Sequence, residues 1–447
     1  MTRVAGRRGK RLIAGLLVLG LVGWWGSPME WALVLAQSSS PAANEEWIQE
    51  IEEIFVPSEQ CKQCHDRHYE EWKGMREQTP DLKTFGRVDG ALLHGTALTS
   101  PVFRTVLGLW LQTKPTSEER TRCLSCHVPA VTVFPQYTDR IIEQVMAGRR
   151  KVKVEGIGCS ACHLINDIQK DGATHPSFKI HPGKTFFGPY AEPEENLVHP
   201  SAQAAVYRGA YYCTSCHFSK VKDVTRPDIP GEIFKGTICQ DCHMEQSTGS
   251  STSKRGALTR PIGRHWFQGI VIPGIMLSNR NLQAEWFSRV DLEVQQHEEG
   301  TLAGNVVIRN GSLPHMFPGG DPVLKHFFVT VTVKDTSGRV IDTQERQFGL
   351  PFEKILRGPI PQPLVNGGVT RRVPFTFKIP DDRNPWLLEA TLSYALIPKP
   401  SDELLEAYLA TLSQEREKQA ARKIIDDYAA PRLLTFRTKT LQHSSMN

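Results

Sequence analysis

The sequence has no cysteine outside five short motifs. All ten cysteines belong to copies of Cys-x-x-Cys-His, so none remains for a disulfide framework. A disulfide inside such a motif would close a strained two-residue gap, which suits redox exchange better than structural cross-linking. Zinc knuckles would not require a histidine after every second cysteine. Because only 15 of 447 residues are histidine, five successive histidines at that position are not a chance pattern.

The motif is the attachment signature of a c-type haem. Its two cysteines form thioether bonds with the haem vinyl groups, and its histidine binds the iron. We therefore predict five covalently attached haem c groups. The attachment cysteines are Cys61, Cys64, Cys123, Cys126, Cys159, Cys162, Cys213, Cys216, Cys239 and Cys242. The motif histidines, expected to bind iron, are His65, His127, His163, His217 and His243.

Beyond its N-terminus, the chain lacks an apolar stretch long enough to span a bilayer. Residues 1–36 begin with basic residues, continue with 14 uncharged apolar residues at Leu12–Trp25, and end with small residues before Gln37. These features predict a cleaved signal peptide and a periplasmic or extracellular protein, with an uncleaved membrane anchor as the alternative. Export agrees with the motifs, because c-type haems are generally attached outside the cytoplasmic membrane.

A strongly basic surface is also missing. Residues 1–36 hold five basic residues and one acidic residue, so without them the formal net charge falls from +5 to +1. Five haems would add up to ten propionate carboxylates, which makes the mature protein acidic. This charge balance excludes nucleic acid as the expected partner.

The motifs do not form a tandem repeat, because their first cysteines are 62, 36, 54 and 26 residues apart. Residues 37–56 are predicted to be a polar linker that ends in a short amphipathic segment. Residues 57–284 are predicted to form a mainly helical, loop-rich haem domain, with helical patterns at Tyr69–Trp72 and Pro101–Trp110. The high glycine and proline content favours such a fold.

The pattern changes to alternation of apolar and polar residues after about residue 285. Residues 329–334 and 339–342 flank a turn at Asp335–Gly338 and predict a hairpin. With the alternating segments near 291–295, 305–309, 375–379 and 388–394, they predict a small antiparallel β-sandwich over 285–400 that carries no covalent haem. Residues 401–447 are predicted to be a single helix capped by Ser401, followed by a tail, with Leu405, Tyr408, Leu409 and Leu412 on one face of the helix. That face packs on the protein or binds a partner. The predicted fold class is α+β.

Ten histidines outside the motifs are available as second ligands to the irons. The order of segments resembles the exported multihaem cytochromes related to the tetrahaem electron acceptor of hydroxylamine oxidoreductase, here with five motifs and a C-terminal β-domain. The matching pieces beyond the first motif include Tyr69–Trp72, His94–Ala97 with Pro101–Phe103, Cys123–Pro129, Gly156–His163, Gly188–Tyr190 with His199, Cys239–Met244 and Pro314–Gly320.

The resemblance implies that four of these histidines are distal ligands: His94, His199, His265 and His315. The fifth distal ligand stays open between His181, His175 and no protein ligand at all. His68 is expected to face solvent. Structural or exposed roles are expected for His297, His326 and His443.

Five haems with nearly enough histidines to saturate them predict an electron carrier. It would pass electrons between redox proteins, with a membrane quinol-linked complex or an extracellular acceptor as candidate partners. One alternative is an enzyme that converts a small nitrogen or sulfur compound at an open iron. Pentahaem nitrite reductases resemble that case, but they carry lysine in one motif and every motif here keeps histidine. The other alternative is a subunit of an extracellular conductive assembly, and oligomerisation is compatible with all three.

Overall fold

The computed structural model describes residues 43–73, 94–168, 178–194, 196–209, 211–217, 239–244, 246–265, 267, 289–296, 300–309, 326–355, 369–378 and 385–441. The predicted signal peptide, residues 37–42 of the predicted linker and the His315 loop lie outside these ranges. Residues 47–447 form one compact unit. No helix in the described part is long and apolar enough to cross a membrane.

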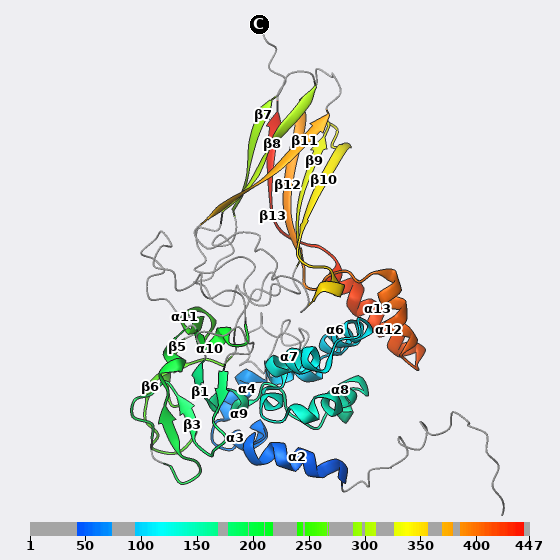
Figure 1. Cartoon of the computed structure of the whole chain (residues 1–447). Coiled ribbons are helices and arrows are strands. Elements are labelled where there is room, and N and C mark those ends of the chain that lie inside the picture. Colours follow the sequence, from blue (N-terminus) through cyan, green and yellow to red (C-terminus); the bar gives the residue numbers. More distant parts are fainter. Residues whose placement is uncertain are drawn as a thin grey trace, which may run out of the picture. The chain divides into compact units, whose positions relative to one another are not determined.

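Short helices carry the motif half of the chain (Figure 1). They are α2 (Ala43–Ile54), α3 (Ser58–Cys61), α4 (Asp66–Trp72), the 3-10 helix His94–Thr99, α6 (Pro101–Gln112), α7 (Ser117–His127), α8 (Thr138–Met146), α9 (Cys159–His163), α10 (Tyr211–Thr214) and α11 (Cys239–His243). The helical patterns predicted at Tyr69–Trp72 and Pro101–Trp110 correspond to α4 and α6.

Local capping fixes where the longer helices begin. The Ser100 hydroxyl accepts a hydrogen bond from the Val102 amide, with Pro101 at the first position of α6. Thr116 and Glu119 form a reciprocal capping box at the start of α7. These caps orient α6 and α7 so that their apolar faces enter one core together with α2 and α8.

Three small two-stranded sheets interrupt the helical region and were not predicted. They pair β1 (Ile165–Ile168) with β2 (Phe178–Ile180), β3 (Phe186–Gly188) with β4 (Ser201–Gln203), and β5 (Gln246–Gly249) with β6 (Arg260–Gly263). Strands of three or four residues are too short to show a period in the sequence. They nevertheless matter for the site, because His199 lies two residues before β4 and His265 two residues after β6.

In the described residues after the last motif, two antiparallel sheets follow the helical region (Figure 1). One has the order β10 (Val340–Phe348), β9 (His326–Lys334), β12 (Trp386–Ala395) and β13 (Arg432–Leu441). The other has the order β11 (Thr370–Lys378), β8 (Thr301–Arg309) and β7 (Arg289–Gln296). The predicted hairpin is present as β9 and β10, where the Asp335 carboxylate accepts hydrogen bonds from the Ser337 and Arg339 amides. Gly338 takes a positive φ of 85° in the turn.

The alternating residues of both sheets point into one shared core. Val329, Val331 and Val333 are nearly fully buried, as are Phe375 and Phe377 of the other sheet. The prediction of strands from period-two alternation is therefore correct for this region.

The C-terminal segment differs from the prediction of one helix and a tail. It forms two helices, α12 (Asp402–Ala410) and α13 (Glu415–Ala429), and then β13, which pairs with β12. Ser401 caps α12 as predicted, by accepting a hydrogen bond from the Leu404 amide. Tyr408 packs directly on Gly108 of α6, where an added Cβ would lie 2.2 Å from the tyrosine ring. The apolar face of α12 is therefore used within the chain.

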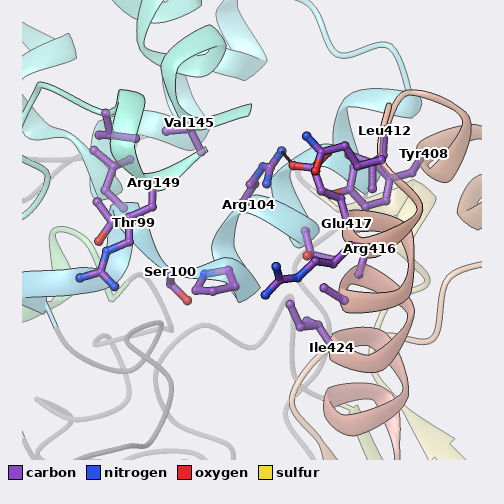
Figure 2. Close-up of a pocket in the computed structure, with 17 residues that line it drawn as sticks. Thr99, Ser100, Arg104, Val145, Arg149, Tyr408, Leu412, Arg416, Glu417 and Ile424 are labelled. Atoms are coloured by element: carbon purple, nitrogen blue, oxygen red, sulfur yellow. Dashed lines mark hydrogen bonds and ion pairs between the residues drawn. The ribbon is translucent and has the colours of Figure 1, made fainter. Parts of the chain in front are cut away.

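A cavity of about 340 Å³ lies beside this helix contact. Figure 2 shows it between α6 and α13, bridged by the ion pair of Arg104 and Glu417 at 3.2 Å. Its lining includes none of the motif cysteines or histidines. The candidate haem sites are therefore elsewhere.

Candidate haem sites

Each motif forms about one helical turn. In the first and fourth motifs the histidine amide donates a hydrogen bond to the carbonyl of the first cysteine, at 2.8 Å for His65 to Cys61 and 2.8 Å for His217 to Cys213. The other three motifs lie at the end of α7 or fill α9 and α11. Residues three and four apart share one face of a helix. Both thiols and the imidazole of a motif can therefore meet the same porphyrin.

His65 of the first motif faces His199. Their ring centroids are 6.3 Å apart with an angle of 32° between the ring planes. The Nδ1 atom of His65 is 2.7 Å from the Ser251 carbonyl oxygen, and that of His199 is 3.2 Å from the Ser201 hydroxyl. A hydrogen bond at Nδ1 fixes the ring and leaves Nε2 to bind a metal.

His163 of the third motif faces His265 in the same way. Their centroids are also 6.3 Å apart, and the rings are closer to parallel, at 24°. Nδ1 of His163 is 2.7 Å from the Phe187 carbonyl oxygen, and Nδ1 of His265 is 3.0 Å from that of Gly263. Both carbonyls belong to the small sheets, which explains why β3 and β6 matter to this site.

His217 of the fourth motif lies near His94. Their centroids are 5.8 Å apart, and the rings are nearly perpendicular at 74°. The Phe267 ring stands edge-on to His94 at 4.5 Å and to His265 at 5.6 Å, so one side chain contacts two predicted distal ligands.

These separations can be compared with what one iron requires. Two imidazoles bound in trans through Nε2, with metal–nitrogen bonds of about 2.0 Å, place their ring centroids about 6.3 Å apart. The first and third motifs match this value, and the fourth is within about half an ångström of it. The residues present therefore fit an iron between each pair.

Burial favours the neutral form of several of these imidazoles, which is the form that binds metals. Desolvation lowers the pKa of His94 to about 3 and the pKa of His127 to about 4. Desolvation also lowers the pKa of His65 and of His163, and the hydrogen bond from each ring to a backbone carbonyl works in the opposite direction.

For His127 of the second motif, the described ranges show no ring contact with another imidazole. His127 packs against the Phe103 ring, with centroids 4.3 Å apart. His243 closes α11, and the Cys242 side chain lies outside the described part of the chain. His315 also lies outside it, so its assignment stays a prediction.

The remaining histidines lie in different surroundings. His326 is buried in the β-domain, with Nε2 2.6 Å from the Leu350 carbonyl oxygen and Nδ1 2.6 Å from the Gln347 amide nitrogen, as its predicted structural role requires. The prediction that His68 faces solvent is wrong, because its side chain is 15% exposed and its ring centroid lies 4.5 Å from that of His265. His181 has a buried Nδ1 with no hydrogen-bond partner in the described structure. Outside the described ranges lie His175, His297 and His443.

Contacts between motifs define which sites are neighbours. Cys61 contacts Cys159, Cys126 contacts Cys216, and Cys213 contacts Cys239 through their side chains. These contacts join the first motif to the third, the second to the fourth and the fourth to the fifth.

Two tyrosines join the third motif to the fourth. The hydroxyl groups of Tyr207 and Tyr212 donate hydrogen bonds to the Cys162 carbonyl at 2.7 and 3.0 Å. Tyr212 directly precedes the first cysteine of the fourth motif. All five motifs therefore lie in one connected group.

Sequence reasoning missed the groups that hold the histidines in place. Most are backbone carbonyls, which carry no residue signature. Glu71 is one exception, because its buried carboxylate accepts a hydrogen bond from the His265 amide at 2.8 Å. The charged pair within Tyr69–Trp72 was the signal that could have found it.

No protein-family model and no curated protein matches the chain. Among solved structures, it is similar to a penta-heme cytochrome c552 from Thermochromatium tepidum. The two share 19% sequence identity, with a TM-score of 0.48, over 86% of this chain and 99% of that one.

Proposed function

We propose that this protein is an exported multihaem c-type cytochrome that relays electrons between redox partners. One observation carries the proposal: histidines distant in sequence stand opposite the motif histidines at the separation that one iron requires. When bound, haem supplies an iron that gains or loses one electron. The motif cysteines would hold the haem covalently, and the paired imidazoles would bind its iron in both oxidation states.

Three pairs support histidine on both sides of the iron: His65 with His199, His163 with His265, and His217 with His94. Two histidines hold the reduction potential low, whereas methionine would raise it. His315 is proposed as a further distal ligand, and five haems remain the proposed number because the sequence holds five motifs.

The contacts between motifs support a continuous path for electrons. They favour an order of first, third and fourth motif, with the second and fifth both beside the fourth. In this order the first, second and fifth motifs are end points. Electrons could therefore enter at one motif and leave at another, as transfer between two redox partners requires. The proposed partners are redox proteins, with a membrane quinol-linked complex or an extracellular acceptor as candidates.

Rapid mixing with a small reductant tests the relay. We expect all five haems of the intact protein to accept electrons, with absorbance changes that account for five haems per chain. A protein whose haems fail to accept electrons, or one purified under haem-replete conditions without covalent haem, would contradict the proposal.

The enzyme alternative requires one iron with an open side, and the second motif is its best candidate. Phe103 covers one face of His127, and the described residues offer no imidazole facing it. Addition of nitrite, cyanide or nitric oxide to the ferric protein separates the two functions. A spectrum that does not respond supports the relay, and a response at one haem supports the enzyme.

A further inference from the structure

Glu71 connects the helix after the first motif to the segment that carries His265. Its carboxylate accepts a hydrogen bond from the His265 amide at 2.8 Å. It also forms ion pairs with Arg264 at 2.5 Å and with Arg67 at 3.1 Å. The residue is only 3% exposed, although it is charged and lies on a short helix. A buried carboxylate is rare unless it is paired and hydrogen-bonded, so these contacts explain why it is tolerated.

The same place could be mistaken for a small metal site. Ligand atoms of His68, Glu71 and His265 lie within 4.8 Å of one another. However, two guanidinium groups already neutralise the carboxylate, and a cation would be repelled by them. Nδ1 of His265 is also occupied by the Gly263 carbonyl. The arrangement therefore orients a histidine and does not hold an additional ion.

Glu71 fixes the His265 backbone, and two other contacts fix the His265 ring. The Gly263 carbonyl holds Nδ1 at 3.0 Å, and the His68 ring lies against it with centroids 4.5 Å apart. His68 is itself next to the carboxylate, with Nδ1 3.9 Å from it. The ring that results stands 6.3 Å from that of His163.

We propose that Glu71 is a positioning residue for the distal histidine of the third-motif iron. The inference rests on the proposed function, because it assigns His265 to that iron. Its consequence is that α4, which directly follows the first motif, controls the ligation of a neighbouring site. Loss of the carboxylate would release the His265 amide and leave two arginines without their shared partner.

The test compares Glu71→Ala with Glu70→Ala in the full-length haem-loaded protein, because alanine removes the acceptor that glutamine would keep. Glu70 is the matched control, because it lies on the same helix but its side chain is 36% exposed and, in the described structure, its ion pair is with Lys62. We expect Glu71→Ala to convert one iron in five to the high-spin state in the ferric spectrum, and added imidazole to restore the low-spin state. Glu70→Ala should match the wild type. Restoration by imidazole is a response that a merely structural role would not give.

The possible results distinguish failure of this inference from failure of the proposed function. A haem-loaded wild type with an unchanged Glu71→Ala spectrum would overturn this inference alone. A wild type without covalent haem would overturn the proposed function as well. If Glu71→Ala does not yield folded protein, Glu71→Asp replaces it, since it keeps the charge but shortens the side chain. A partial high-spin signal at one iron would then support the inference, and a wild-type spectrum would refute it.

Discussion

Replacement of His199 by alanine should remove one axial ligand and little else. The His199 ring is half-buried, and its neighbours Leu197 and Val198 are 106% and 80% exposed. The backbone conformation does not depend on the imidazole, because the Asn196 side chain accepts hydrogen bonds from the Val198 and His199 amides at 3.0 and 2.8 Å. Alanine keeps both bonds. We therefore expect the free energy of unfolding to change by no more than about 1 kcal/mol apart from the lost ligand.

The spectroscopic effect should be much larger than the effect on stability. His65 would keep its hydrogen bond to Ser251 and remain on the proximal side, so only the opposite side of that iron opens. One motif in five corresponds to about one fifth of the iron changing from low to high spin. A His199→Met variant offers sulfur in place of nitrogen, and it should stay low-spin while the reduction potential of that haem rises.

Electron paramagnetic resonance of the ferric protein, with spin integration against total iron, measures this fraction. Leu197→Ala is the control, because it alters the same loop without removing a ligand. A His199→Ala protein with five haems and the wild-type spin count would refute the pairing of His199 with the first motif.

Two further changes test other parts of the structure. Gly95→Ala places a Cβ 2.7 Å from the Trp72 carbonyl oxygen, so it should displace the adjacent His94. We expect a higher high-spin fraction at the fourth motif and a loss of about 1–3 kcal/mol in the free energy of unfolding. Asp139→Asn removes an ion pair in which both Asp139 oxygens contact the Arg120 guanidinium group. In the wild type, this ion pair lowers the pKa of the Asp139 carboxyl below its usual 3.8. Because the aspartate is 56% exposed, its contribution should be about 0.2–1 kcal/mol.

The pH dependence of the Asp139→Asn effect on stability follows from the lowered pKa of Asp139 in the folded protein. A lowered pKa in the folded state gives stability that is present above pH 3.8 and is lost as the pH falls through the folded-state pKa. Chemical denaturation at neutral and acidic pH should show the two proteins converging at low pH. A difference that persists there would contradict the ion-pair explanation, and a low-spin Gly95→Ala protein would contradict the tight approach beside His94.

Regular local patterns were predictable from the sequence. The period-two alternation of Val329, Val331 and Val333 identified β9, because one face of the strand is buried in the shared core. The motif spacing indicated which residues would meet one porphyrin, since it matches one helical turn. Ser401 likewise marked the start of α12.

Features that depend on tertiary contacts were not predictable. Strand β13 is an edge strand and carries charged residues such as Arg437 and Lys439. Charge on an edge strand prevents pairing with other chains. Because of these charges, the segment was predicted to be a tail. The four residues 411–414 are not helical and divide a helical pattern that looked continuous in the sequence.

Which distal histidine pairs with which motif could also not be predicted from the sequence. His199 precedes the fourth motif in the chain, yet it faces His65 of the first. Nothing local encodes that choice. The pairing follows from β3 and β4, which are too short to be read from sequence, and from backbone carbonyls such as that of Ser251.

Near-infrared magnetic circular dichroism of the wild-type ferric protein tests the central claim most directly, because it distinguishes irons with two histidine ligands from those with methionine or an open side. The structure predicts two-histidine ligation for at least three of the five irons, those of the first, third and fourth motifs. A protein in which fewer than three irons carry this signature would contradict the assignment of the three pairs.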